Sequence, residues 1–210
     1  GIETCREQIA EGIDLIACGD MGIGNTTPSS AIISVITGTD PDLTTGRGTG
    51  IDDNTLAHKA SVVRQAIEVN RPDPKDGLDV LAKVGGFEIG VLAGVMLGAA
   101  AGQRPLVIDG FISGAAALIA FAIAPQVRHR FIASHQSVEP GHHIALKAMK
   151  LEPLLHMGMR LGEGTGAALA MHIIEASAKC LSDIATFSEA RVSVRLDDSV
   201  SDEVVNEAVH

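Results

Sequence analysis

The sequence of 210 residues contains no tryptophan and no tyrosine, and aromatic residues make up only 2% of it. Proteins that bind single-stranded nucleic acids stack the bases on aromatic rings, so this scarcity argues against that class. The formal net charge of −10 argues in the same direction, because a negative surface repels a phosphate backbone. We therefore expect no nucleic-acid partner, and a core built from aliphatic residues.

Cysteine is also scarce. Cys5, Cys18 and Cys180 are far apart and have no metal-like spacing, which is typical of a protein of the reducing cytosol. No signal-peptide pattern is visible at the start of the sequence. The longest apolar run, Ile89 to Ala101, is too short to span a bilayer. We therefore predict a cytoplasmic protein with no membrane partner.

Common cofactor motifs are missing or incomplete. No lysine follows a glycine, which excludes a Walker A motif and with it kinases and ATPases of the P-loop type. The segment from Gly22 to Thr27 resembles the start of a dinucleotide fingerprint, but Thr27 replaces the third glycine. His135, His142 and His143 match no common zinc spacing, so we expect no zinc site.

Strand and helix patterns alternate along the chain. Short apolar runs with polar or glycine boundaries predict strands at 13–19, 105–110 and 130–134. Helices are predicted at 28–35, 54–69, 79–84, 87–101, 113–124, 144–149 and 165–182, with a polar loop at 37–50. Thr27 is expected to cap the first of these helices, and Asp52 or Asp53 the second.

This alternation implies parallel strands joined by right-handed crossovers. We therefore predict an α/β fold with a Rossmann-like, mostly parallel sheet flanked by helices and with a small helical subdomain that is incomplete. The large domain is expected to span residues 1–190, and residues 191–210 to be part of the small helical domain or a loose tail. The sequence starts at Gly1 and has, from Ile2 to Glu7, the pattern of a helix already under way, which predicts that an N-terminal part is missing.

Polar residues follow each predicted strand. Ligands of such sheets bind outside the carboxyl ends of the strands, so we expect these residues to meet at one edge. They are Asp20 and Gly22 after the first strand, Asp109 and Gly110 after the second, and His135 and Ser137 after the third.

One carboxylate, Glu163, lies between Gly162 and Gly164, directly before an alanine-rich helical run. Glycines allow the backbone to approach a ligand closely, and the start of a helix directs free N–H groups at an anion. This stretch is therefore predicted to supply both a base and a phosphate cradle. Lys59, by contrast, lies in a capped helix, where a solvated face is the simpler interpretation.

Taken together, the motifs resemble the nicotinate-nucleotide–dimethylbenzimidazole phosphoribosyltransferase family, which makes the lower ligand of cobalamin. The resemblance covers nearly the whole chain, in order. It rests on Gly19-Asp20-Met21-Gly22-Ile23-Gly24-Asn25-Thr26-Thr27, Thr45-Gly46-Arg47-Gly48-Thr49-Gly50, His58-Lys59, Gly85-Gly86-Phe87-Glu88-Ile89, Asp109-Gly110-Phe111, Ser134-His135 and Leu161-Gly162-Glu163-Gly164.

The resemblance implies a reaction and a site. The family transfers phosphoribose from nicotinate mononucleotide to 5,6-dimethylbenzimidazole, giving α-ribazole 5′-phosphate and nicotinate, without a metal or redox cofactor. Its members are homodimers. Glu163 matches the general base of the family, and the substrate-binding positions are matched by Asp20, Gly22, Lys59, Asp109, Gly110, Ser137, Leu161 and Gly162.

The chain departs from the family pattern in two ways. Asp20 stands where many relatives have glutamate, and the N-terminal part that supplies much of the small domain and of the benzimidazole pocket is absent. Two alternatives stay open at this point. One is an oxidoreductase that binds a nicotinamide dinucleotide at the Gly22 turn, and the other is an inactive, truncated form of the transferase.

Overall fold

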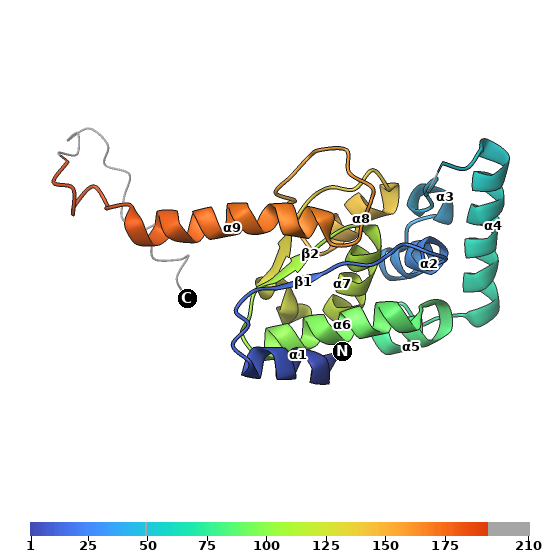
Figure 1. Cartoon of the computed structure of the whole chain (residues 1–210). Coiled ribbons are helices and arrows are strands. Elements are labelled where there is room, and N and C mark those ends of the chain that lie inside the picture. Colours follow the sequence, from blue (N-terminus) through green and yellow to red (C-terminus); the bar gives the residue numbers. More distant parts are fainter. Residues whose placement is uncertain (49, 193–210) are drawn as a thin grey trace, which may run out of the picture. The chain divides into compact units, whose positions relative to one another are not determined.

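The described residues contain a parallel sheet of three short strands (Figure 1). The computed structural model describes residues 1–48 and 50–192. Strands β1 (Ile16–Cys18), β2 (Leu106–Ile108) and β3 (Phe131–Ala133) pair in the order β1-β2-β3. Leu106 pairs with Ile16 on one side and with Phe131 on the other, so the three strands start in register. The predicted α/β fold with a parallel sheet flanked by helices is confirmed.

Helices occupy most of the remaining chain. Within the described residues they are α1 (Ile2–Ala10), α2 (Thr26–Thr37), α3 (Pro41–Thr44), α4 (Asp53–Asn70), α5 (Gly77–Val84), α6 (Phe87–Ala101), α7 (Phe111–Ile123), the 3₁₀ helix η1 (Pro125–Arg130), α8 (Pro140–Ala148) and α9 (Thr165–Asp183). None of the helices in this part of the chain combines the length and the apolar character that crossing a membrane requires.

Local capping explains where several helices begin and end. The Asp52 carboxylate accepts a hydrogen bond from the amide of Thr55 at 2.8 Å, which caps α4 as predicted. Arg71 adopts a left-handed conformation with φ of 46°, and Pro72 follows it, so α4 ends there. The bounds predicted for α6 are confirmed.

Three predictions for local structure were wrong. Helix α2 begins one residue before Thr27 and has Asn25 as its N-cap, because Asn25 is held by a hydrogen bond to Asp20. The predicted 37–50 loop contains α3, whose cap is the Asp40 carboxylate and whose first residue is a proline. Helix α8 begins four residues before Ile144, again at a proline, which is pre-organised for the first helical position.

The core is aliphatic, as the composition predicted. All three residues of β2 are fully buried, and so are Leu118 and Ile119 of α7. Helices α1 and α6 lie side by side (Figure 1), because Gly98 of α6 leaves room for Cys5 of α1. A side chain at residue 98 would overlap the Cys5 side chain, so the glycine sets this helix separation.

The chain forms two compact units, Gly1–His172 and Ile173–His210. The sheet belongs to the first unit, and α9 passes from the first unit into the second. The predicted domain division at residue 190 stays a prediction. Residues 193–210 of the predicted C-terminal segment lie outside the described residues.

Candidate active site

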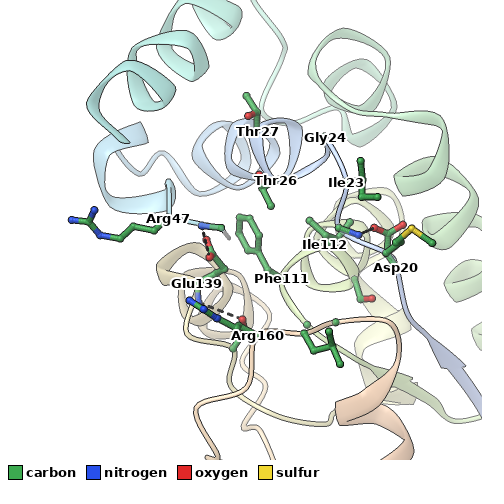
Figure 2. Close-up of a pocket in the computed structure, with 18 of the residues that line it drawn as sticks. Asp20, Ile23, Gly24, Thr26, Thr27, Arg47, Phe111, Ile112, Glu139 and Arg160 are labelled. Atoms are coloured by element: carbon green, nitrogen blue, oxygen red, sulfur yellow. Dashed lines mark hydrogen bonds between the residues drawn. The ribbon is translucent and has the colours of Figure 1, made fainter. Parts of the chain in front are cut away.

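A cavity of about 1190 Å³ lies at the carboxyl edge of the sheet (Figure 2). Loops that follow β1, β2 and β3 contribute to its wall, together with α4, the loop that precedes α4 and the loop that precedes α9. The structure brings all nine predicted site residues together in this wall: Asp20, Gly22, Lys59, Asp109, Gly110, Ser137, Leu161, Gly162 and Glu163.

Asp20 stabilises the turn that follows β1. One of its carboxylate oxygens accepts hydrogen bonds from the backbone amide of Gly22 at 2.8 Å and from the side-chain amide of Asn25 at 2.6 Å. Gly22 and Gly24 have φ of 67° and 72°, a conformation that glycine adopts without steric cost. The Asp20 side chain therefore closes a tight turn whose backbone faces the cavity.

Glu163 lies at the tip of a loop that is bent back toward β1. The φ of Glu163 is 57°, and its neighbours Gly162 and Gly164 have φ of 76° and 79°, so three successive residues are left-handed. The Glu163 amide donates to the carbonyl oxygen of Asp20 at 2.9 Å. Within the described part of the chain the Glu163 carboxylate accepts no hydrogen bond, and it faces the cavity as an exposed, ionisable group.

Gly19 allows this loop to approach β1. A Cβ atom at residue 19 would overlap the backbone nitrogen of Gly164, and it would also lie 2.8 Å from the carbonyl carbon of Glu163. Real Cβ atoms do not come so close to backbone, so any larger residue would displace the loop. The position of Glu163 therefore requires a glycine on a different element, directly after β1.

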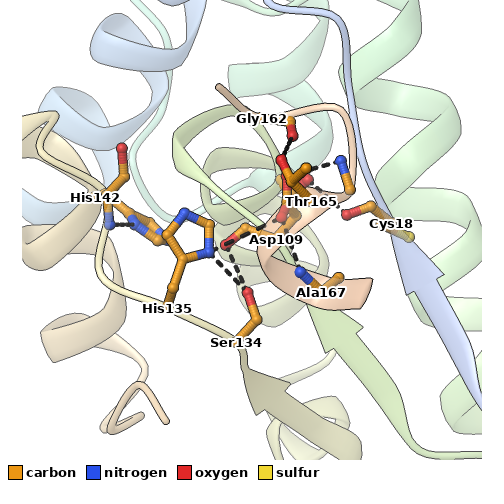
Figure 3. A network of polar contacts seen from close by, with 11 residues as sticks. Cys18, Asp109, Ser134, His135, His142, Gly162, Thr165 and Ala167 are labelled. Carbon is orange, nitrogen blue, oxygen red and sulfur yellow. Dashed lines mark hydrogen bonds and ion pairs between the residues drawn. The ribbon is translucent and has the colours of Figure 1, made fainter. Parts of the chain in front are cut away.

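Asp109, which directly follows β2, also holds the loop that carries Glu163 (Figure 3). One oxygen of its carboxylate accepts from the amide of Gly164 and the other from the amide of Ala167, both at 3.0 Å. Asp109 is only 1% exposed, so this bidentate contact is shielded from water. The phosphate cradle predicted at the start of α9 is therefore wrong for these two amides, because a carboxylate of the protein already occupies them.

His135 and Ser134 extend this polar network (Figure 3). The Ser134 hydroxyl donates to the carbonyl oxygen of Asp109 at 3.2 Å and lies 2.9 Å from Nδ1 of His135. Burial lowers the pKa of His135, and the negative charge of Asp109 partly opposes that shift. Gly166 packs directly against the His135 ring, where a side chain would overlap Nδ1.

Ser137 is positioned by a second buried histidine. The amide of Ser137 donates to Nδ1 of His142 at 3.0 Å, so Nδ1 must be unprotonated. Burial, together with the smaller effect of the charges of His135 and His143, lowers the pKa of His142 to about 3. His142 is therefore a neutral acceptor that orders the loop after β3. Among the described residues, no group of three or more histidine, cysteine or acidic side chains is placed to hold a metal.

Lys59 lies in the cavity wall and is half-buried, so the interpretation as a solvated helix face is wrong. Its ammonium donates to the carbonyl oxygen of Gly46 at 3.0 Å. Burial lowers the pKa of Lys59, and the negative charge of Glu139 opposes the shift.

Three charged residues of the cavity wall were not predicted: Arg47, Glu139 and Arg160 (Figure 2). Arg47 pairs with Asp53 at the start of α4 and donates to the carbonyl oxygen of Ile51 at 2.8 Å. Arg47 lies within the family-like motif Thr45–Gly50, and Arg160 directly precedes the motif that begins at Leu161. Glu139 had no such signal, because its contacts are with a distant part of the sequence.

The fold and the site together define an α/β protein with a ligand cavity at the carboxyl edge of a parallel sheet. The cavity contains an exposed carboxylate, two arginines and a half-buried lysine, which suits a small anionic ligand with a polar reacting centre.

Sequence comparison agrees with the motifs. A family model described as "Phosphoribosyltransferase" matches residues 1–192, so the chain belongs to this phosphoribosyltransferase family. A relative from Desulforudis audaxviator is 61% identical over 193 residues, which are 92% of this chain and 55% of the relative. A relative from Roseiflexus sp. is 58% identical over 94% of this chain and 56% of the relative. Both are named nicotinate-nucleotide–dimethylbenzimidazole phosphoribosyltransferase.

Solved structures give the same result. The crystal structure of CobT from Thermus thermophilus matches with a TM-score of 0.86 and 45% identity, over 92% of this chain and 58% of that one. The family resemblance drawn from the motifs is thus confirmed. The match favours a transferase over the dinucleotide-dependent oxidoreductase. The chain spans about half the length of the curated relatives it matches.

The neutral state of His142 predicts a dependence of stability on pH. Its pKa is about 3 in the folded protein against 6.5 when unperturbed, so the unfolded state binds the proton more readily. The free energy of unfolding should therefore be unaffected by His142 above pH 6.5 and should fall by about 1.4 kcal/mol per pH unit below it. Urea denaturation between pH 4 and 8 measures this slope.

His142→Asn should make the slope shallower, whereas His129→Asn, at an exposed histidine, should preserve it. Equal slopes in His142→Asn and in the unmodified protein would contradict the assignment of His142 as the neutral acceptor.

Proposed function

We propose that the protein transfers phosphoribose from nicotinate mononucleotide to 5,6-dimethylbenzimidazole, giving α-ribazole 5′-phosphate and nicotinate, with inversion at the anomeric carbon. The observation that carries this proposal is the Glu163 carboxylate, which faces the cavity without a hydrogen-bond partner in the described part of the chain. The names of the relatives and the family match support the same reaction.

The reaction suits this cavity chemically. Nicotinate in the donor is a pyridinium, so its departure as a neutral ring removes a positive charge and needs no acid catalyst. The ribose carbon then has oxocarbenium character, and one nitrogen of the benzimidazole attacks it from the opposite face. The other benzimidazole nitrogen must lose its proton, which requires a base on the acceptor side.

We assign Glu163 as that general base. A carboxylate near the acceptor N–H makes the attacking nitrogen more nucleophilic, an effect worth roughly 10²–10⁴-fold in rate. A base must reach its substrate, and Glu163 is exposed at the cavity wall with its side chain uncommitted. The backbone that carries it is fixed by Asp20 and Asp109, so only the side chain needs to adjust.

The other predicted residues bind substrate in this proposal. Lys59 supplies a positive charge for the anionic donor, and Leu161, 62% exposed, offers an apolar surface beside Glu163 for a flat ring. Backbone groups at the glycines approach the ligand closely. The remaining positions are Asp20, Gly22, Asp109, Gly110, Ser137 and Gly162. Holding donor and acceptor on opposite faces of one ribose contributes the rest of the rate.

The decisive variant is Glu163→Gln in the full natural polypeptide. It keeps the shape of the side chain but removes the base, so kcat with dimethylbenzimidazole should fall by roughly 10²–10⁴-fold. Calorimetry should find nicotinate mononucleotide binding within about twofold of the unmodified protein, because the donor does not need the base. Glu68→Gln, at an exposed carboxylate of α4, is the matched control and should leave both quantities unchanged. A turnover close to that of the unmodified protein in Glu163→Gln would exclude the role given to Glu163.

We also propose that the protein acts as a homodimer in the cytoplasm and uses neither a metal nor a redox cofactor. The names of the relatives support only the last part, because phosphoribosyl transfer requires no redox step. Analytical ultracentrifugation of the full polypeptide should give twice the monomer mass, and a monomer at micromolar concentration would contradict the dimer.

A further inference from the structure

The segment Gly46-Arg47-Gly48 is held at both ends by opposite charges. The Lys59 ammonium donates to the carbonyl oxygen of Gly46 at 3.0 Å. The Glu139 carboxylate accepts from the amide of Gly48 at 2.9 Å, a bond drawn in Figure 2. Lys59 comes from α4, and Glu139 is the residue directly before α8. We call this arrangement the charge clamp.

The burial of the Glu139 carboxylate lowers the stability of the folded protein. Glu139 is only 8% exposed, and its second carboxylate oxygen, Oε2, is buried and has no hydrogen-bond partner among the described residues. Oε2 lies against the Cα of Gly46, where any side chain would overlap it. A buried carboxylate with an unfilled oxygen destabilises a protein, and a packed apolar residue would serve stability better. Stability therefore does not explain why the carboxylate is there.

The charge of Glu139 acts on Lys59. The two side chains interact electrostatically, and no hydrogen bond joins them. Burial disfavours the charged form of Lys59, whereas the negative charge of Glu139 favours it.

Other charged groups surround this pair. His58 and Asp53 lie on α4, and Arg47 lies on the segment itself, where it pairs with Asp53. The cavity wall also contains Asp20, Asp109, His135, Arg160 and Glu163. Asp20 accepts hydrogen bonds from its own loop, and Asp109 accepts them from the amides of Gly164 and Ala167. Arg47 is paired with Asp53. Glu139 is thus the carboxylate that binds the same Gly46–Gly48 segment as Lys59.

We propose that Glu139 is a positioning residue, which fixes the Gly46–Gly48 segment at the cavity wall and supplies the counter-charge to the Lys59 ammonium that binds the anionic substrate. It touches no substrate atom itself, because Oε1 is bound to Gly48 and Oε2 is buried against Gly46. The inference rests on the proposed function, in which Lys59 binds the anionic donor.

The isosteric variant Glu139→Gln in the full natural polypeptide separates charge from shape. Its side-chain oxygen can still accept from the amide of Gly48, but the negative charge is gone. NMR titration of the Lys59 ammonium, assigned with Lys59→Arg, should show its midpoint lowered by roughly one pH unit or more. Glu152→Gln, at an exposed carboxylate outside the cavity, should leave the midpoint unchanged. This readout needs no catalytic activity, so it tests Glu139 even if the proposed function fails.

Kinetics test the consequence for substrate binding. In Glu139→Gln, the alkaline limb of kcat/KM should move to lower pH by the same roughly one unit, which is about a tenfold loss at a fixed pH on that limb. The loss should appear in KM for nicotinate mononucleotide and leave kcat within about twofold. Glu139→Asp, which keeps the charge but reaches less far, should restore the pH limb.

Two results would overturn the proposal. One is an unchanged Lys59 titration in a folded Glu139→Gln variant. The other is a uniform loss of activity at all pH values, equal in Glu139→Gln and Glu139→Asp, which would reveal a structural role alone. If Glu139→Gln does not fold, the titration of Glu139→Asp decides: the midpoint of the unmodified protein supports the proposal, and a lowered midpoint contradicts it.

Discussion

The contact on which the site depends is the bidentate hydrogen bond between the Asp109 carboxylate and the amides of Gly164 and Ala167. It joins the end of β2 to the first turn of α9 and thereby fixes the loop that carries Glu163. A hydrogen bond to a charged group makes a net contribution of about 1.5–3 kcal/mol to stability. The two bonds to Asp109 are shielded from water, because the side chain is buried. A left-handed conformation at a non-glycine residue such as Glu163 is unfavourable, so contacts from the surrounding structure must stabilise this loop. The position of Glu163 therefore depends on a carboxylate whose two oxygens each accept a backbone hydrogen bond.

The same principle recurs around the cavity: charged and polar side chains hold backbone, and the backbone presents the groups that meet the ligand. Asp20 closes its own turn, His142 holds the amide of Ser137, and Glu139 holds the amide of Gly48. Glycines make these approaches possible, since a side chain at residue 19 or 46 would overlap the neighbouring segment. These contacts fix the backbone around the cavity, whereas the Glu163 carboxylate accepts no hydrogen bond in the described part of the chain. Pre-organisation of this kind favours positioning of two substrates over chemistry by many side chains.

Much of this arrangement follows from the sequence. Apolar runs bounded by glycine or polar residues gave all three strands, and α6 lies between Gly86 and Gly102 as predicted. The rule that ligands meet the carboxyl ends of parallel strands brought the predicted residues to one cavity. The sequence did not predict that α3 and α8 begin at prolines, or which individual residues of distant segments contact each other. Glu139 and Gly48 are 91 positions apart, and periodicity carries no information about such a pair.

The central claim is that Asp109 acts through the Glu163 loop, and a double-mutant cycle in the full natural polypeptide tests it most directly. Asp109→Asn places an NH₂ group against one of the two amides, so it should release the loop and lower kcat. If Asp109 matters because it positions the base, the variant with both Asp109→Asn and Glu163→Gln should be no slower than Glu163→Gln alone, within about twofold. Losses that multiply, so that the double variant is slower than Glu163→Gln by the full factor of Asp109→Asn, would contradict the account.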